Sequence, residues 1–440
     1  MNNENKPTKV VVVGCGYVGL TAAACLADLG HVVVGVENNA DRLASLRQGK
    51  APFFEPDLDA LVASGQTGNR LSFTEDLTAA VVDADVVLIS VPTPSLGDGA
   101  ADLTIVESVV STLSKSLPSG AVVVLKSTVP IGTSTQVVGW LGRSDVEVVA
   151  NPEFLQAGQA VKAFQHPDRV VVGASNKEAG HKVAALYAGL NAPVIITDQR
   201  SAELIKYASN TYLALRLSFV NTVATLCEQG GGDATTVLAG MGLDHRIGSA
   251  FLQPGPGWGG SCFPKDTRAL AAVIRNAEAD DTMLEAALAA NQKRLRQMVK
   301  VATQAVGGSL HGKKIAVLGL TFKAGTDDLR DSPSLAIAKG LVAAGAKVTS
   351  YDPMVSVSPE GARHAGSALE AAKEAEVVMV LTEWPEFTEL DLSSLAEAMA
   401  GNQIIDTRGL LNKESCQDAG LTLWQVGKGY QIPNQNEKGK

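Results

Sequence analysis

The chain alternates between short, wholly apolar runs and longer stretches in which apolar residues recur at helical spacing. The first run, Lys9–Val13, is a continuous β-branched segment that suits a buried parallel strand. A glycine-rich turn and a helical stretch, Leu20–Leu29, come next. A second apolar run, His31–Val36, ends at Glu37. This order of strand, glycine turn, helix, strand and acid predicts a βαβ unit.

The turn after the first strand reads Gly14-Cys15-Gly16-Tyr17-Val18-Gly19 and has GxGxxG spacing. In this context the glycines would serve the tight turn, the approach of a pyrophosphate and the helix–strand contact. The helix N-terminus would bind the phosphates. Glu37 would hydrogen-bond the ribose hydroxyls and repel a 2′-phosphate, so NAD is favoured over NADP. The alternative is a coincidental motif in a βαβ unit that binds no nucleotide.

The alternation continues, which predicts an α/β domain with a mostly parallel sheet. Further strands are expected at Asp85–Val91, Ala121–Lys126, Val146–Val149 and Arg169–Val172. Loops at the carboxyl ends of parallel strands carry ligand groups, and Thr93, Thr128 and Glu153 lie in such loops. Taken alone, each of them fits ordinary turn chemistry better than a function.

One long helical run follows over Ala202–Gln229 and is closed by three glycines. Such a helix suits a bridge between domains or a subunit interface. Lys206 and Asn210 are four residues apart on this helix and therefore share one face. The alternative is that this face is simply exposed to solvent. A second helical stretch is expected over Pro264–Val306.

A second α/β unit follows a Gly-Gly-Ser boundary at 307–309. Its strands are expected at Lys314–Gly319, Lys347–Asp352, Glu376–Leu381 and Gln403–Asp406, with a helix at Leu335–Ala344. The turn after its first strand lacks GxGxxG but carries Lys323 between glycines. That position suits a phosphate better than a second dinucleotide, although an ordinary solvated lysine fits it too.

The length agrees with several domains, because 440 residues are too many for one hydrophobic core. Hydrophobic residues make up 45% and charged residues 19%, which is typical of a globular protein. We predict an α/β fold with two Rossmann-like domains joined by a long central helix and a helical middle region. The expected parts are an NAD-binding Rossmann domain over 1–200, a central dimerisation and catalytic region over 201–306, and a Rossmann-like domain over 307–440.

Charge and cysteine usage exclude several classes of protein. The net charge is −9 without a basic cluster, so a nucleic-acid partner is not expected. No apolar run approaches the roughly 20 residues that cross a bilayer, and the polar first nine residues do not resemble a signal peptide. We therefore expect a soluble, cytoplasmic protein without a membrane partner. The five cysteines lack CxxC spacing and the six histidines form no pair, so neither disulfides nor a metal site is expected.

The segment Gly257–Asp266 gathers three glycines, a cysteine, a lysine and an aspartate in ten residues. Pro264 is predicted to be the first residue of a helix, so Cys262 would directly precede a helix N-terminus. The partial positive charge there, with Lys265 nearby, favours a thiolate. The alternative is a glycine loop with an inert, buried cysteine.

A dinucleotide site combined with a reactive cysteine indicates chemistry at the aldehyde level. Oxidation of an alcohol by NAD gives an aldehyde, to which a thiolate adds. The thiohemiacetal can lose a second hydride to become a thioester, and water then releases an acid.

Eight motifs in order make the chain similar to the UDP-glucose/GDP-mannose dehydrogenase family, from about Lys9 to about Leu411. The motifs are the turn at Gly14, Val91–Pro94, Ser127–Pro130, Asn151–Leu155, Glu203–Asn210, Arg246–Gly248, the Cys262 loop and Phe322-Lys323. The resemblance implies a four-electron oxidation of UDP-glucose to UDP-glucuronate at carbon-6 and a C-terminal domain that binds the UDP-sugar. The same chemistry on UDP-N-acetylmannosamine, UDP-N-acetylglucosamine or GDP-mannose is the alternative.

The resemblance also implies catalytic roles. Cys262 would be the nucleophile, and Lys206 and Asn210 would face the developing oxyanion. Glu153 would activate the hydrolytic water, which Thr128 would hold. An aspartate would handle protons with an ordered water. The implied catalytic set is Cys262, Lys206, Asn210, Asp266, Glu153 and Thr128.

The binding residues implied by the resemblance come from all three predicted parts of the chain. The cofactor set is Gly14, Gly16, Tyr17, Val18, Gly19, Glu37, Arg42, Pro92, Thr93, Ser127, Thr128, Glu153, Lys265 and Arg330. The substrate set is Phe154, Leu155, Lys206, Asn210, Arg246, Phe251, Leu252, Gly255, Gly259, Phe322, Lys323 and Arg408. Arg246 would reach the sugar bound to a neighbouring subunit, so a homodimer or higher homo-oligomer is expected.

The chain departs from the family pattern near both motifs that carry the chemistry. Ala157 stands where a second glutamate is common, which would leave Glu153 as the sole hydrolytic base. Trp258 replaces the usual Phe or Tyr and Pro256 stiffens the loop before it, so the sugar preference stays open. Two further hypotheses are a two-electron dehydrogenase of the 6-phosphogluconate type, with a structural Cys262, and a non-catalytic NAD-sensing protein.

Overall fold

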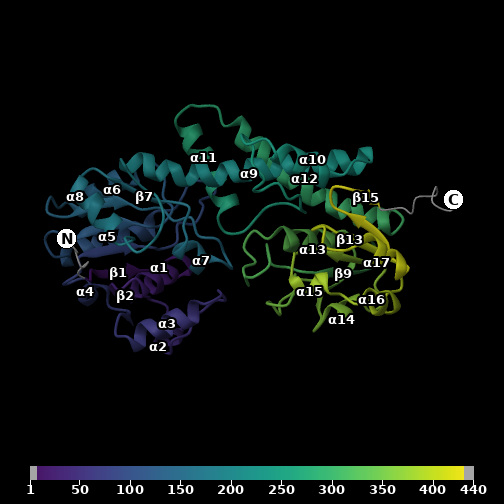
Figure 1. The fold of residues 1–440 in the computed structure, drawn as a ribbon, viewed down its shortest axis with the longest axis horizontal. Helices are drawn as coiled ribbons and strands as arrows, with labels where there is room; N and C mark the ends of the chain where they lie inside the picture. The colour runs from purple at the N-terminus through teal and green to yellow at the C-terminus, as the bar shows by residue number, and fades with distance from the viewer. Residues whose placement is uncertain (1–6, 431–440) are drawn as a thin grey trace. The chain divides into compact units, whose positions relative to one another are not determined.

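The computed structural model describes residues 7–430 (Figure 1). The chain divides into two compact units, one formed by Met1–Asn210 with Arg268–Ala279 and the other by Thr211–Thr267 with Asp280–Lys440. The division falls inside the helices α9 (Gln199–Gly230) and α11 (Phe263–Asn276), which each contribute residues to both units. The three-part division at residues 200 and 306 stays a prediction.

The first unit contains an eight-stranded sheet in the order β3-β2-β1-β4-β5-β6-β7-β8. All neighbouring strands are parallel except β6 and β7. The order of its first six strands is that of a Rossmann fold, whose topological switch lies between β1 and β4. The strands are β1 (Lys9–Val13), β2 (Val32–Val36), β3 (Leu71–Thr74), β4 (Val86–Ile89), β5 (Val122–Leu125), β6 (Glu147–Ala150), β7 (Val170–Ala174) and β8 (Val194–Thr197).

Apolar side chains cover both faces of this sheet. Val10 and Val12 belong to one buried cluster, and Val11 and Val13 to the other. Burial on both faces is the reason that the strands are continuous β-branched runs without alternation. The helices of this unit are α1 (Tyr17–Asp28), α2 (Ala40–Arg47), α3 (Leu58–Thr67), α4 (Leu77–Ala80), α5 (Thr104–Ser116), α6 (Thr133–Leu141), α7 (Ala160–Gln165) and α8 (Lys177–Ala185).

The second unit contains a seven-stranded sheet in the order β11-β10-β9-β12-β13-β14-β15, which is parallel except for the last pair. Its strands are β9 (Lys314–Leu318), β10 (Lys347–Tyr351), β11 (Arg363–His364), β12 (Val377–Val380), β13 (Gln403–Asp406), β14 (Thr422–Gln425) and β15 (Gly429–Tyr430). Its helices are α10 (Ala234–Gly242), α12 (Thr282–Ala305), α13 (Pro333–Ala343), α14 (Ala368–Ala372), α15 (Pro385–Thr388), α16 (Leu392–Ala398) and α17 (Lys413–Asp418). The predicted α/β class with two Rossmann-like sheets is confirmed.

The prediction of one helical stretch over Pro264–Val306 is wrong. Two helices, α11 and α12, occupy it, and the chain between them passes through a left-handed conformation at Glu278 (φ 55°). Asp280 accepts a hydrogen bond from the backbone of Thr282 at 2.9 Å where α12 begins. Neither glycine nor proline marks this break, so the pattern of apolar residues predicts one continuous helix across it.

Residues 7–430 contain neither a candidate membrane span nor a candidate metal cluster. No helix there is both long and apolar enough to span a membrane. Within the same residues, no group of three or more His, Cys, Asp or Glu side chains could hold a metal ion.

Candidate active site

The glycine turn after β1 leaves room for a dinucleotide. A Cβ on Gly19 would lie 1.8 Å from the carbonyl oxygen of Gly14, so only glycine lets α1 pack this closely on β1. A Cβ on Gly16 would meet nothing within 4 Å, and no side chain caps the helix there. The first backbone N–H groups of α1 therefore face an open cradle of the kind that binds a pyrophosphate, and the turn fits NAD.

Glu37 is buried at the end of β2, next to this turn. Its Oε1 accepts a hydrogen bond from the backbone of Asn39 at 2.9 Å, and its Oε2 accepts one from Cys15 at 3.3 Å. The carboxylate is thus fixed at the edge of the glycine turn, where a ribose would be recognised. Arg42, also predicted to bind the cofactor, lies on α2 with an exposed side chain.

The loops after β4 and β5 are tied to each other at the carboxyl edge of the sheet. Thr93 Oγ1 donates a hydrogen bond to the carbonyl oxygen of Thr128 at 2.8 Å. Ser127 Oγ donates to the carbonyl oxygen of Val91 at 2.7 Å. The structure therefore brings together predicted loop residues that are more than 30 positions apart in sequence.

Tyr17, the residue predicted to contact the cofactor at the start of α1, also donates a hydrogen bond to Glu55. The buried Glu55 carboxylate accepts further hydrogen bonds from the backbone N–H groups of Gly158 and Ala160, at 2.8 and 2.7 Å. The loop that contains Ala157 is thereby fastened to the cofactor turn through one carboxylate.

Lys206 and Glu153 form a buried ion pair. Lys206 Nζ lies 2.9 Å from Glu153 Oε1, and the two side chains are only 3% and 6% exposed. Glu153 Oε2 accepts a hydrogen bond from the backbone of Leu155 at 2.6 Å. Asn210 follows Lys206 by about one turn of α9 and is also buried.

The environment of Glu153 keeps this carboxyl group ionised. Burial alone would raise its pKa, but the charge and hydrogen bond of Lys206, the Leu155 N–H and the charge of Lys126 oppose that effect, and the net result is a lowered pKa. A carboxylate that stays ionised in an enclosed site can accept a proton from water.

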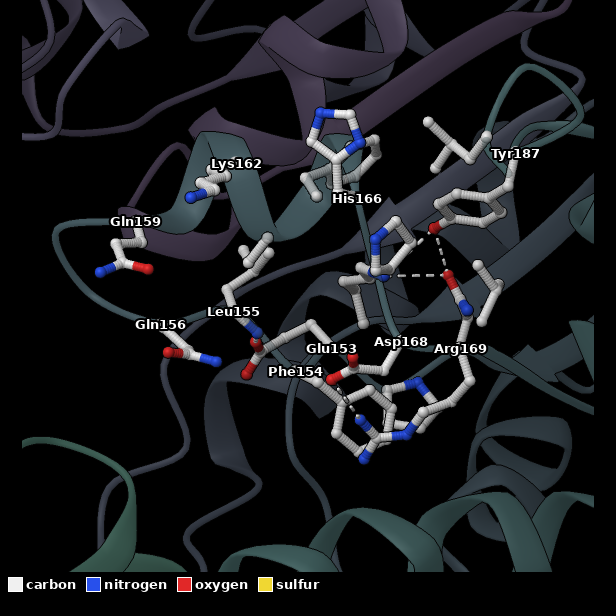
Figure 2. Close-up of a pocket in the computed structure, with 18 residues that line it drawn as sticks. Glu153, Phe154, Leu155, Gln156, Gln159, Lys162, His166, Asp168, Arg169 and Tyr187 are labelled. Atoms are coloured by element: carbon white, nitrogen blue, oxygen red, sulfur yellow. Dashed lines mark hydrogen bonds and ion pairs between the residues drawn. The ribbon is translucent and has the colours of Figure 1, made fainter. Parts of the chain in front are cut away.

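A cavity of about 190 Å³ opens beside Glu153 (Figure 2). The Arg169 guanidinium stacks on the Phe154 ring, with 3.6 Å between its Cζ and the ring centroid. Lys206 Nζ lies 5.4 Å from the centroid of the same ring. Phe154 and Leu155, both predicted to bind substrate, line the cavity with Glu153. All of these residues belong to the first unit.

Cys262 belongs to the second unit, immediately before α11. Its carbonyl oxygen accepts the hydrogen bond of the Asp266 backbone at 2.8 Å, as expected for the residue that opens a helix. Its thiol is partly exposed. Lys265 Nζ lies 2.7 Å from Asp266 Oδ1, and the Asp266 side chain is buried. The helix begins one residue earlier than predicted, and Cys262 remains at its N-terminus.

The glycines of the Cys262 loop are required by close neighbours. A Cβ on Gly259 would lie 2.0 Å from the carbonyl oxygen of Asp331. Gly260 has φ +83°, and a Cβ there would lie 2.8 Å from the Phe322 ring. The loop is therefore pressed against the segment that follows β9, which carries the predicted substrate residues.

Trp258, one of the departures from the family pattern, anchors this loop. Its indole N–H donates to Ser218 Oγ on α9 at 2.8 Å. Its backbone exchanges hydrogen bonds with the Asn291 side chain on α12, at 2.9 and 2.8 Å. The indole donor has a specific acceptor here, which a phenylalanine would not use.

The predicted anion-binding residues of the second unit are ordered by backbone carbonyls and acids. Arg408 donates to the carbonyl oxygens of Leu381 and Phe322, at 2.8 and 3.2 Å. A Cβ on Gly255 would lie 3.3 Å from its guanidinium. Lys323 Nζ lies 6.0 Å from the centroid of the Phe322 ring. Arg408, Phe322 and Gly255 therefore meet in one region of this unit.

Arg330 lies close to Cys262 within the second unit. The Asp328 side chain, which accepts hydrogen bonds from Arg330 at 2.8 and 2.6 Å, raises the pKa of Arg330, and negative charge on Cys262 adds to that effect. Arg330 thus places a positive charge near the sulfur. That charge favours the thiolate form of Cys262.

Three predicted substrate residues lie before the Cys262 loop. Arg246 is 78% exposed and pairs with Asp244 at 2.6 Å. Phe251 has φ 55° and a ring centroid 6.3 Å from that of Phe263, whereas Leu252 is buried.

Sequence reasoning missed the role of Glu203. Its buried carboxylate accepts hydrogen bonds from the backbone N–H groups of Gly132 and Ser134, at 2.5 and 2.7 Å, and thereby caps α6. Burial raises its pKa although these donors oppose that effect. Glu203 fastens the loop that carries Thr128 to the same helix as Lys206. The position of Glu203 one helical turn before Lys206 is the feature of the sequence that could have indicated this role.

Sequence reasoning also gave no role to Lys126, Asn151 and Tyr187, which form a buried polar network beside Glu153. A lysine at the end of an otherwise apolar strand run was the signal for it, because a buried strand end seldom carries an ammonium group without a purpose.

Three family models match the chain in succession, all from the UDP-glucose/GDP-mannose dehydrogenase family. The NAD binding domain matches residues 8–191, the central domain 200–293 and the UDP binding domain 316–413.

Individual relatives match over nearly the full length. The chain is 43% identical to a UDP-glucose 6-dehydrogenase of Rhizobium meliloti, over 96% of this chain and 99% of the relative. Among solved structures, a UDP-glucose dehydrogenase from Pyrobaculum islandicum superimposes with a TM-score of 0.89 at 33% identity, covering 98% of this chain and 99% of that one. A UDP-D-ManNAc dehydrogenase from Pyrococcus horikoshii gives a TM-score of 0.86 at 26% identity, over 96% and 100% of the two chains.

Proposed function

The chain belongs to the UDP-glucose/GDP-mannose dehydrogenase family and is an NAD-dependent oxidoreductase, and we propose that it oxidises UDP-glucose at carbon-6 to UDP-glucuronate. The observation that carries the proposal is the buried Lys206–Glu153 pair beside the substrate motif, in a chain that resembles UDP-glucose 6-dehydrogenases throughout its length. The overall reaction consumes one water and two NAD⁺ per UDP-glucose and releases UDP-glucuronate, two NADH and three protons.

NAD, held by the glycine turn and by Glu37, supplies the hydride acceptor when it is bound. The protein itself supplies the nucleophile. The Cys262 thiolate adds to carbon-6 at the aldehyde level, and the oxidised adduct is a thioester on the same sulfur. The helix N-terminus and Arg330 support the negative charge that the sulfur carries before attack.

Lys206 and Glu153 divide charge stabilisation and proton transfer between them. Lys206, assisted by Asn210, supplies positive charge to the oxyanion that forms on the substrate. Glu153 takes a proton from the water that attacks the thioester, with Thr128 holding that water. Asp266, paired with Lys265, handles the protons released in the oxidation steps. Since Ala157 replaces the second glutamate, Glu153 serves as the sole base.

Substrate anchoring is assigned to residues that precede and follow the Cys262 loop in the sequence. Phe154 and Leu155 line the cavity of the first unit. Lys323 and Arg408 offer positive charge to the diphosphate. Gly255 and Gly259 let a sugar nucleotide lie against the backbone. Phe251, Leu252 and Phe322 would complete the substrate site.

We also propose that the enzyme is a homodimer or higher homo-oligomer. Tyr212, Phe219 and Leu226 recur every seven residues on α9 and are 61%, 56% and 64% exposed. Large apolar side chains at this spacing form one stripe on a helix, which is suited to burial against a second copy. The exposed Arg246 would then be available to a substrate bound by that copy.

A cytoplasmic location fits the same proposal. Cys15, Cys25, Cys227 and Cys416 form no disulfide, which suits a reducing compartment, and the reaction needs intracellular NAD.

Steady-state NADH production with a panel of nucleotide sugars tests the choice of substrate. UDP-glucose should give the highest kcat/KM, ahead of UDP-N-acetylmannosamine, UDP-N-acetylglucosamine and GDP-mannose. A higher value for one of the other three would reassign the sugar but leave the reaction type intact. No NADH with any of them would contradict the proposal and favour a binding protein.

A further inference from the structure

Lys126 is a buried lysine with unusual partners. The residue is 4% exposed, directly after β5. Its Nζ donates hydrogen bonds to Asn151 Oδ1 and to the Tyr187 hydroxyl oxygen, each at 3.1 Å. Both partners are neutral, and in the described part of the chain no carboxylate lies within 4 Å of this ammonium. Burial of a charged ammonium destabilises a protein unless another charge nearby compensates.

Lys126 lies at the same cavity as Glu153. Both residues line the cavity described above, and the ammonium favours the ionised form of the Glu153 carboxyl group. The other titratable or charged groups around this cavity or paired with Glu153 are Lys206 on α9, Lys162 on α7, His166 and Asp168 after α7, Arg169 before β7 and Tyr187 after α8.

The network also fixes the backbone that leads to Glu153. Tyr187 donates a hydrogen bond of 2.5 Å to the same Asn151 oxygen that Lys126 contacts. The Asn151 amide nitrogen donates to the carbonyl oxygen of Val171 at 2.7 Å. Asn151, at the end of β6, is therefore held in place two residues before Glu153. The same hydrogen bonds hold the Lys126 ammonium group.

We propose that Lys126 is a positioning residue that supplies Glu153 with a fixed second positive charge for the hydrolysis of the thioester. The inference rests on the proposed function, because it concerns the base of that reaction. Lys206 interacts with two negative charges, that of the Glu153 carboxylate and that of the substrate oxyanion. Its attraction to the oxyanion weakens its interaction with Glu153. Lys126 cannot move toward the oxyanion, because Asn151 and Tyr187 hold its ammonium group by hydrogen bonds. Its charge therefore remains near Glu153.

The step that depends on this charge is proton transfer from water. The water oxygen forms a bond to the thioester carbon as its proton passes to Glu153. The carbon–sulfur bond then breaks, and the Cys262 sulfur leaves as a thiolate. No electrons are exchanged with an oxidant or reductant in this step. A Glu153 that is already protonated cannot take part in it.

Lys126→Gln tests the inference, because glutamine can keep hydrogen bonds to Asn151 and Tyr187 but removes the charge. The acid limb of the kcat–pH profile should move upward by about one pH unit, which is a tenfold loss on that limb. Intact-protein mass spectrometry should show a covalent substrate adduct on Cys262 that accumulates in the steady state. The KM for UDP-glucose should change by less than about twofold.

Two further variants separate charge from structure. Lys126→Arg keeps the charge and should keep the acid limb near its wild-type position. Tyr187→Phe keeps the charge, removes the two hydrogen bonds of the Tyr187 hydroxyl group and should lower the unfolding midpoint without moving the limb. A wild-type profile in Lys126→Gln without adduct would overturn the inference, as would equal shifts in Lys126→Gln and Tyr187→Phe. If Lys126→Gln does not fold, an acid limb displaced equally in Lys126→Arg and Tyr187→Phe would overturn it.

The wild-type enzyme provides the test of the underlying function. NADH formation from UDP-glucose by the wild type, with an unaltered Lys126→Gln variant, rejects only the inference about Lys126. An inactive wild type rejects the proposed function and the inference together.

Discussion

The buried pair of Lys206 and Glu153 joins stability and chemistry in two side chains. The pair lowers the pKa of Glu153, so its contribution to stability is complete above the ordinary pKa of a glutamate, about 4.3. That contribution is lost as the pH falls through the lower pKa of the folded state. The same charge arrangement makes Glu153 available as a base at neutral pH.

Glu153→Gln is expected to destabilise the protein by about 3–5 kcal/mol at pH 7, because it removes the negative charge of a buried ion pair. The difference from wild type should shrink at acid pH, where wild-type Glu153 becomes protonated as well. Urea unfolding at several pH values measures both effects. Glu374→Gln, which removes an exposed partner of Lys314, is the matched control and should have almost no effect. Equal losses in the two variants would show that burial of the pair does not matter.

Cys262→Ser should lose several orders of magnitude in turnover, because a serine hydroxyl is a far weaker nucleophile than a thiolate. Binding of NAD and of UDP-glucose, measured by calorimetry, should stay within a few-fold of wild type. Cys25→Ser, at a buried cysteine in the core of the first unit, serves as the control for loss of a thiol elsewhere. Full activity in Cys262→Ser would assign Cys262 a structural role.

For single residues, the sequence predicted which side chains take part in the chemistry but not which of them contact each other. Lys206 and Glu153 are separated by 53 positions, and nothing in a single sequence reports that the two side chains touch. In the sequence, Lys126 is only the last residue of the expected strand Ala121–Lys126. Only its burial and its neutral partners reveal that its charge is directed at another residue.

The Cys262 loop is the element in which packing constrains sequence most tightly. Gly259 has no room for a Cβ because of the Asp331 carbonyl oxygen, and Trp258 fixes the loop to α9 and α12. The loop therefore holds Cys262 at the start of α11 both by the close backbone contact at Gly259 and by the hydrogen bonds of Trp258. A substitution at Gly259 must move the backbone.

Gly259→Ala should destabilise the protein by about 1–3 kcal/mol, the usual cost of overpacking. It should also lower kcat, since the loop positions Cys262. Gly97→Ala is the control, because a Cβ on Gly97 would meet nothing within 4 Å. Chemical denaturation and steady-state kinetics on both variants decide the matter. A Gly259→Ala enzyme as stable and as active as the control would refute the close contact.

Elements with continuous apolar runs were predictable, and those interrupted without glycine or proline were not. The strands β1, β4 and β5 lie within or next to the predicted ranges because both faces of the sheet are buried. The break between α11 and α12 escaped prediction because residues 277–281 contain neither glycine nor proline.

For the whole molecule, the exposed apolar surface of α9 concerns association with a second copy of the chain. The stripe of Tyr212, Phe219 and Leu226 on α9 exposes large apolar area in a chain of net charge −9. Such a stripe lowers the free energy of association when a second copy covers it.

Phe219→Glu should therefore dissociate the proposed oligomer, because it would place a carboxylate within the buried stripe. Light scattering coupled to size-exclusion chromatography measures the mass directly. Val82→Glu is the matched control, since Val82 is 64% exposed outside the stripe. A monomeric wild type, or an unchanged mass in Phe219→Glu, would contradict this role of α9.

The class of fold and the order of the two Rossmann-like sheets followed from the apolar runs and the glycine turn. The limits of the compact units did not. Two boundaries fall within α9 and α11, where helical periodicity continues without interruption, and the third falls in the short break between α11 and α12. A boundary inside a helix leaves no pattern of turn residues in the sequence.

The central claim is a four-electron oxidation through a cysteine adduct, and the ratio of NADH formed to UDP-glucose consumed tests it most directly. The reaction is run to completion with excess NAD, and both quantities are measured in the same sample. The account predicts two NADH per UDP-glucose, with UDP-glucuronate as the product. A ratio of one, with an aldehyde or ketone as the product, would contradict it and favour a two-electron dehydrogenase.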